Sequence, residues 1–329
     1  MKSVVTVEEA ASLIESNKRL FVAGDESLLA ALPRGQWIGG TSPYFMSEEG
    51  GLCTNDKVGV APLPEFVTNI ETRFYSTNDL EKIPAGYKRN GFTRLIIPSG
   101  TAIHQKFARS CSHIPGIHGQ PLIGWIAGVN LDDLGKIKPK VFDGNTGASS
   151  TEDAVAMHIE LPASIRAKAN ILNIFQQGTG EAIFFPDDGF TVTDCLVNGE
   201  TKNFAAFVKE KQIDTKLPLV ANDKGTRVNV SFQNVDDEQG VVTFYAPVFS
   251  GMEYKVAAPV DDYEAAFKRE LSAHKGQAYF TCNCILNYMY GGLEGKHTGN
   301  ALGPVAFGEI ANMLLNQTLV YLTFESYAS

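Results

Sequence analysis

The sequence lacks several features that would place it in a functional class at once. No run of apolar residues approaches the ~20 needed to cross a membrane, and no cluster of Lys and Arg is longer than two residues. With 28 Lys and Arg against 37 Asp and Glu, the formal net charge is −9. Nucleic acids and anionic membrane surfaces are therefore poor candidates as partners, because both attract basic patches.

Cysteine is also scarce. An odd, sparse set of five in a chain of 329 residues is not the disulfide framework of a secreted domain. The N-terminal stretch "MKSVVTVEEAASLIES" has neither the apolar segment nor the cleavage site of a signal peptide. We therefore expect a reduced, cytoplasmic protein. The cysteines are Cys53, Cys111, Cys195, Cys282 and Cys284.

A strand, a loop, a helix and a second strand recur three times along the chain. The copies begin with "RLFVAGD" (19–25), "FTRLIIPSG" (92–100) and "GQAYFTCNC" (276–284). Alternation of buried strands with helices predicts α/β units in which the two strands pair in parallel.

The stretch between the second and third copies is rich in alternating, β-branched runs with Gly, Pro and Asn-Gly turns. Helices are predicted after the capping box of Thr6 and Glu9, over 203–213 and over 261–275. The fold class is α/β, with two tightly packed lobes of mixed sheets and helices. We place the boundary near residue 200, giving segments 1–200 and 201–329.

The spacing of Cys282 and Cys284 admits several interpretations. Structural zinc half-sites normally have two to four residues between their cysteines, so a metal clip is disfavoured. Another set of possible ligands, Cys111, His113 and His118, fits an ordinary loop after a helix better than a metal site. A nucleophilic cysteine would need a lowered pKa and a base, for which His274 and His297 are the nearest histidines in sequence. Small buried residues near a pocket are the favoured interpretation.

No serine-hydrolase elbow, HExxH motif or Walker loop is present. Polar residues do follow the buried strands, and ligands of open α/β sheets bind beyond the carboxyl ends of strands. Glu309 is either a buried carboxylate that needs a partner such as a bound amine, or an acid in the first turn of a helix over "IANML". These polar candidates for binding are Thr41, Ser42, Asn287, Glu309 and Asn316.

The segment "GMEYKVAAPVDDYEAAFKRELSAHKGQAYFTCNCI", followed by "FGEIANMLLNQTLVYLTF", resembles the FIST C domain. "RLFVAGDESLLAALPRGQWIGGTSPYF" is similar to the start of the FIST N domain. The resemblance implies a sensory module that binds small ligands such as amino acids. It also implies that Cys282, Cys284 and Asn287 line the pocket opposite Glu309 and Asn316. Two expected features are missing, an Arg soon after the cysteines and a His at the position of Leu315.

We therefore expect a small-ligand-binding sensor without cofactor or metal, whose output passes through a separate signalling protein. The alternative is an enzyme with Cys284 or Cys282 as its nucleophile, although no catalytic signature supports it. A third possibility is a subunit-interaction protein, because Tyr and Met in "NYMYGG" are typical of interfaces.

Overall fold

Three parallel strand pairs form the framework of the molecule. The computed structural model describes residues 2–223, 225–273 and 277–327, and it has the predicted α/β architecture with mixed sheets. A helix joins the strands of each pair, so the predicted parallel pairing within three recurring units is confirmed. The units are β2 (Leu20–Gly24), α2 (Glu26–Ala31) and β3 (Trp37–Thr41); β8 (Gly91–Pro98), α3 (Ala102–Ser110) and β9 (Leu122–Ala127); β23 (Phe280–Cys284), α6 (Ile285–Tyr290) and β24 (Gly303–Ala306).

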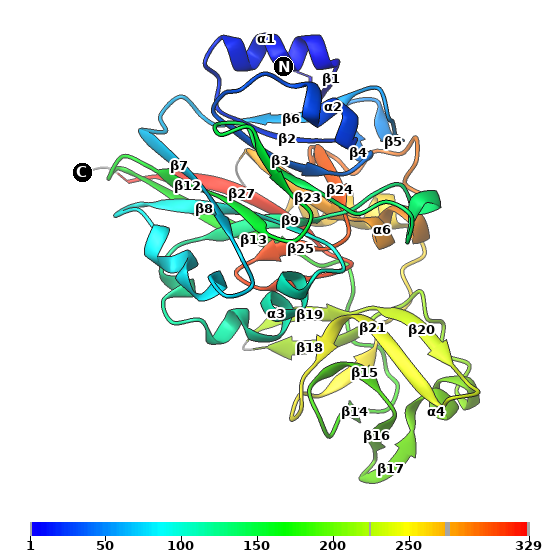
Figure 1. Ribbon diagram of the computed structural model, residues 1–329. Helices are drawn as coiled ribbons and strands as arrows, with labels where there is room; N and C mark the ends of the chain where they lie inside the picture. Colours follow the sequence, from blue (N-terminus) through cyan, green and yellow to red (C-terminus); the bar gives the residue numbers. More distant parts are fainter. Residues whose placement is uncertain (1, 224, 274–276, 328–329) are drawn as a thin grey trace.

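Each unit belongs to a different sheet of the larger lobe (Figure 1). The first sheet has the order β1 (Val4–Val5), β6 (Val58–Pro62), β2, β3, β10 (Val141–Asp143) and β11 (Ala148–Ser150). The second has the order β26 (Leu314–Leu315), β25 (Glu309–Ala311), β9, β8, β12 (Ala154–Glu160) and β7 (Asn69–Tyr75). The third has the order β13 (Ile165–Leu172), β27 (Leu319–Ser326), β23, β24, β4 (Tyr44–Ser47) and β5 (Gly50–Cys53).

In the small lobe, residues 183–256 without residue 224, the structure describes two antiparallel sheets and one helix, α4 (Phe204–Glu210). A turn at Asn198 and Gly199, with φ angles of 54° and 81°, closes the hairpin that the Asn-Gly pair predicts. One sheet has the order β17 (Glu200–Asn203), β16 (Asp194–Val197), β14 (Ile183–Phe184), β22 (Tyr254–Val256), β18 (Leu219–Asp223) and β19 (Thr226–Val230). The other has the order β15 (Gly189–Val192), β21 (Val241–Val248) and β20 (Phe232–Asp236).

The sheets do not divide at residue 200. Strand β27 pairs with β13, strand β25 with β9, and strand β24 with β4, so the end of the chain completes sheets begun in its first half. The two lobes seen in Figure 1 are therefore an inserted small lobe and a larger lobe built from both chain ends. The division of the sequence into segments 1–200 and 201–329 remains a prediction.

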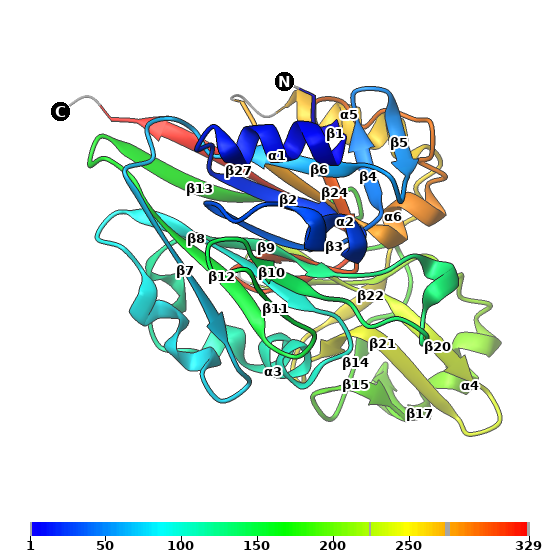
Figure 2. The same ribbon diagram turned by 45° about the horizontal axis from the view of Figure 1, so that its top comes forward.

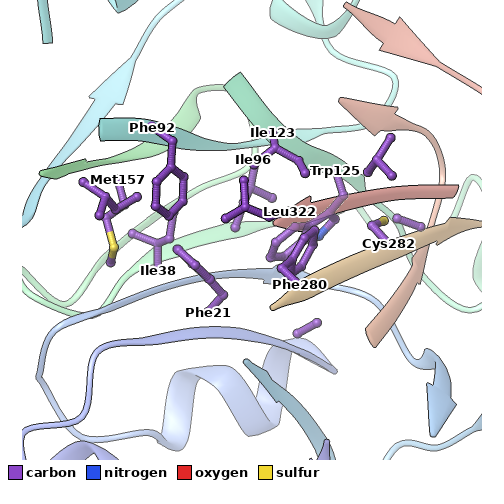
Figure 3. Packing of buried hydrophobic residues seen from close by; sticks show 14 of the residues in the cluster. Phe21, Ile38, Phe92, Ile96, Ile123, Trp125, Met157, Phe280, Cys282 and Leu322 are labelled. Atoms are coloured by element: carbon purple, nitrogen blue, oxygen red, sulfur yellow. The ribbon is translucent and has the colours of Figure 1, made fainter. Parts of the chain in front are cut away.

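The main core lies where the three sheets of the larger lobe meet. Phe21, Trp125 and Phe280 come from different sheets and pack together there (Figure 3). Helix α1 (Val7–Glu15) covers the first sheet (Figure 2), and its predicted capping box at Thr6 and Glu9 is present. The remaining helical segments are α5 (Tyr263–Ser272), η1 (Leu80–Gly86), η2 (Cys111–His113), η3 (Ile117–Gly119) and η4 (Leu131–Asp133).

The helix considered over "IANML" is wrong. Glu309 lies in strand β25 and pairs with Trp125 of strand β9. The chain then turns at Asn312, whose φ of 57° lies in the left-handed region. Pairing with β9 satisfies the backbone groups that a helix would have satisfied internally. Among the described residues, no helix combines the length and apolar character needed to cross a membrane.

Candidate functional site

The seven residues predicted to line a ligand site are all buried, with exposed fractions of at most 4%. Burial alone does not make them a site, so their partners decide the question. The structure gathers some of them around Glu309 and places the others apart. The seven are Thr41, Ser42, Cys282, Cys284, Asn287, Glu309 and Asn316.

Glu309 is fully buried and has a protein partner. Its Oε2 accepts hydrogen bonds from the backbone N–H of Thr318 at 3.1 Å and from the Thr318 hydroxyl at 2.7 Å. Its Oε1 has no hydrogen-bond partner among the described N and O atoms. Burial raises the pKa of Glu309 to about 8, and hydrogen bonds from Thr318 and Cys284 act in the opposite direction. The carboxyl group is therefore largely protonated at neutral pH.

Both predicted cysteines lie beside this carboxyl group. Burial raises the pKa of the Cys282 and Cys284 thiols well above their usual range, and the proximity of Glu309 raises both further. A cysteine nucleophile needs a lowered pKa and access to substrate. Of the suggested bases, His297 is exposed and His274 lies outside the described residues. The geometry therefore argues against a nucleophilic role for either cysteine.

Asn287 joins Glu309 in one hydrogen-bonded group. Its Nδ2 donates to Asn283 Oδ1 at 3.1 Å and to the Thr318 carbonyl at 3.2 Å. The Asn283 Oδ1 also accepts from the backbone N–H of Cys284 at 2.8 Å. We call these five residues the Glu309 network: Asn283, Cys284, Asn287, Glu309 and Thr318.

Asn316 lies at the junction with the small lobe instead. Its Oδ1 accepts hydrogen bonds from the backbone N–H of Ser231 at 3.2 Å and from its hydroxyl at 2.8 Å. Asn229, two residues earlier, donates to the carbonyls of Asn316 and Gln317. These bonds attach the small lobe to the segment just after β26.

Thr41 and Ser42 bond to backbone groups elsewhere. The Thr41 hydroxyl accepts from the Lys140 N–H at 3.0 Å, and the Ser42 hydroxyl donates to the Val305 carbonyl at 2.5 Å. Both side chains therefore stabilise the end of strand β3. The structure does not bring them together with the Glu309 network through any hydrogen bond between described residues.

A separate cleft of about 720 Å³ lies between the two lobes. Its volume is typical of small-molecule sites. In Figure 1, β15 and β21 of the small lobe lie below α3 and α6 of the larger lobe, and all four elements contribute to the walls. The lining residues are Ser99, Gly100, His104, Gln105, Arg109, Leu131, Leu134, Phe190, Thr191, Gln233, Thr243, Phe244, Tyr245, Ile285, Leu286, Met289, Tyr290 and Phe307.

This interlobe cleft adjoins the Glu309 network through α6. Cys284 directly precedes the helix. Tyr245 and Tyr290 line the cleft. Burial is the main cause that raises the pKa of both phenols, and the proximity of Cys284 raises both further. Glu309 and Cys282 do not line the cleft. Glu309, Cys282 and Asn287 thus lie outside the cleft lining, while the "NYMYGG" segment contributes Met289 and Tyr290 to its surface.

Sequence reasoning also missed a buried cation. Arg94 is fully buried, and its three side-chain nitrogens have no hydrogen-bond partner among the described residues. The guanidinium carbon lies 3.1 Å from the ring centroid of Phe280 and 4.1 Å from that of Phe21. Two aromatic faces therefore replace the usual carboxylate partner. An Arg inside the apolar run "FTRLIIP" was the available signal.

The possible metal ligands after α3 do not converge. Cys111 is buried, whereas His113 and His118 are exposed. Within residues 2–223, 225–273 and 277–327, no group of three His, Cys, Asp or Glu side chains could hold a metal ion.

A family model describes almost the whole chain. It matches residues 5–325 and is described as a family of unknown function, DUF6976. A comparison with curated proteins gave no significant match. The family match makes no connection to the FIST domains, so that resemblance stays a prediction. The chain belongs to the DUF6976 family.

Proposed function

We propose that the protein binds a small molecule in the interlobe cleft and acts as a sensor. The observation that carries the proposal is that three large apolar side chains, Leu134, Tyr245 and Met289, are 53%, 39% and 48% exposed and all line the same cleft. Apolar surface left in water is unfavourable, and a ligand that covers it gains binding energy. Amino acids and related metabolites remain the proposed ligand class.

The position of the cleft supports a role in signalling. Leu134 and Met289 belong to the larger lobe, whereas Tyr245 belongs to the small lobe. A ligand that contacts both sides adds free energy to the arrangement of lobes that it fits, and shifts the population toward it. We infer that a separate signalling protein reads this arrangement in the cytoplasm.

A thermal-shift screen tests the proposal. The protein as purified is first weighed by native mass spectrometry, and then screened against amino acids, organic acids and amines. A ligand at ~100 times its Kd stabilises the folded state by about 2.7 kcal/mol, so we expect at least one clear rise in Tm. No rise from the whole panel with a folded protein would contradict the proposal.

Two matched variants locate the site. Leu134 lines the cleft, whereas Ile137, three residues later and 47% exposed, does not. We expect Leu134→Ser to weaken binding about fivefold, since one apolar contact contributes ~1 kcal/mol. Ile137→Ser removes a similar exposed side chain and should leave the affinity unchanged. Equal effects of the two variants would place the ligand elsewhere.

A further inference from the structure

The charge of the interlobe cleft differs from that of the chain. The chain carries 37 Asp and Glu against 28 Lys and Arg, yet no Asp or Glu is among the described residues that line the cleft. Within that described lining, Arg109 supplies the single full charge. A bound amine would find no carboxylate there, because Glu309 lies behind the wall and its Oε2 is occupied by Thr318.

Arg109 lies over an aromatic ring of the small lobe. It lies in the last turn of α3, and its guanidinium carbon is 5.4 Å from the ring centroid of Phe190. This distance is within the range of a cation–π contact, which uses none of the guanidinium N–H groups and leaves them available to an acceptor. Arg109 has no ion-pair partner among the described residues. Gln105, one turn earlier on the same helix, also lines the cleft and adds an amide.

His104 does not add a second positive charge. Its Nδ1 accepts the backbone N–H of Gly100 at 3.3 Å, so the ring carries its proton on Nε2. Burial lowers the pKa of His104 to about 4, which keeps the imidazole neutral at pH 7. The electrostatic preference of the cleft therefore depends on Arg109.

We propose that the cleft selects an organic anion with an apolar body, whose carboxylate or similar acidic group pairs with Arg109 while Leu134, Tyr245 and Met289 cover the body. This rests on the proposed function, because it specifies the ligand of the same cleft. It favours organic acids over amines of the same size. Charge-assisted hydrogen bonds to Arg give geometric specificity as well as affinity.

A pair of fluorescent probes that differ in charge tests the selectivity. 8-Anilinonaphthalene-1-sulfonate is an anion, and N-phenyl-1-naphthylamine has the same aromatic body without the sulfonate. We expect the anion to bind about tenfold more tightly than the neutral probe at low salt, and Arg109→Gln to remove that difference. The neutral probe should bind Arg109→Gln as it binds the wild type.

Arg166→Gln is the matched control. Arg166 is also exposed and also lies over an aromatic ring, Tyr327, at 5.2 Å, but it does not line the cleft. Its substitution should leave both affinities unchanged. Equal binding of the two probes to the wild type, with both weakened by Leu134→Ser, would overturn the anion preference and leave the binding function intact. Failure of both probes to bind the folded protein would count against the cleft as a binding site and so against both proposals.

Discussion

The two sides of helix α6 differ in the polarity of the side chains around them. On the core side, the Glu309 network packs a carboxyl, a thiol, a hydroxyl and two amides against one another, and each of these residues is at most 2% exposed. On the side of the small lobe, Met289 is 48% exposed and adjoins a cleft lined mainly by apolar residues. The polar residues at strand ends predicted a binding site on the core side of α6, whereas the interlobe cleft lies on the side of the small lobe.

The reason for the difference is hydrogen bonding. Asn287 donates to the Thr318 carbonyl and Thr318 donates to Glu309, so these side chains are held in the core and do not line the cleft. Asn283 Nδ2, Asn287 Oδ1 and Glu309 Oε1 have no hydrogen-bond partner among the described N and O atoms. The side chains of Met289 and Tyr245, in contrast, make no hydrogen bond to any other residue that the structure describes. A cleft remains between the lobes where such side chains do not pack against one another. A polar motif therefore indicates a network as readily as a pocket.

Thiol labelling offers the largest contrast between closed and open regions. Cys53 is exposed, whereas the other four cysteines are buried, and burial raises the pKa of Cys111 and of Cys195 to about 11. We expect one thiol per chain to react with iodoacetamide in the native protein, at least ~1000 times faster than the rest, because the others require opening of the fold. Peptide mass spectrometry identifies the site. Rapid labelling of Cys282 or Cys284 would instead revive the enzyme alternative.

Substitution of Arg94 tests how the closed core carries a charge. Cation–π contacts contribute ~2 kcal/mol when desolvated, but burying an ion costs several kcal/mol, and Arg94 has no described hydrogen-bond partner to offset this. We expect Arg94→Met to raise the free energy of unfolding by about 1–2 kcal/mol, measured by urea denaturation. The exposed control Arg166→Met should change it by less than ~0.5 kcal/mol. A loss of stability on Arg94→Met would mean that the guanidinium has a partner of its own.

The pH dependence of stability tests whether the buried carboxyl group of Glu309 is protonated in the folded protein. Its pKa is about 8 in the folded protein against an ordinary value of 4.5, so unfolding releases a proton between these values. The contribution of Glu309 is therefore complete below about pH 4.5 and falls as the pH rises toward about 8, by at most about 1.4 kcal/mol per pH unit. Cys284 and Cys282, the titratable groups beside it, stay neutral over this range because burial raises the pKa of both thiols.

The variant Glu309→Gln removes the ionisation of this side chain and so isolates its contribution to the pH dependence of stability. The amide keeps an oxygen for the two Thr318 donors but cannot ionise. We expect the stability of the variant, relative to the wild type, to rise steadily between pH 5 and 8 in denaturation measurements. Parallel stability curves for the two proteins would show that the carboxyl is ionised in the folded state.

Much of the fold follows from local sequence. The Thr6 capping box, the Asn198-Gly199 turn and the helix after Asp262 depend on neighbouring residues, and all three occur where the sequence predicts them. Glu309 was ambiguous, since an acid before "IANML" suits a helix start, and pairing with β9 from nearly 200 residues away decided for a strand. Local preference yields to tertiary hydrogen bonding in such cases.

The sequence by itself determined the three strand–helix–strand units, because the spacing of apolar residues fixes each unit within about 40 residues. It also predicted that Cys282 and Cys284 would be buried, as they are, but it left Glu309 open between a buried carboxylate and a helix start. Only the tertiary structure decided where a ligand has room. The walls of the interlobe cleft come from segments as distant as Arg109, Tyr245 and Met289, and the space depends on how two lobes meet. The volume of the cleft depends on how the two lobes pack against each other, and no local pattern in the sequence predicts it.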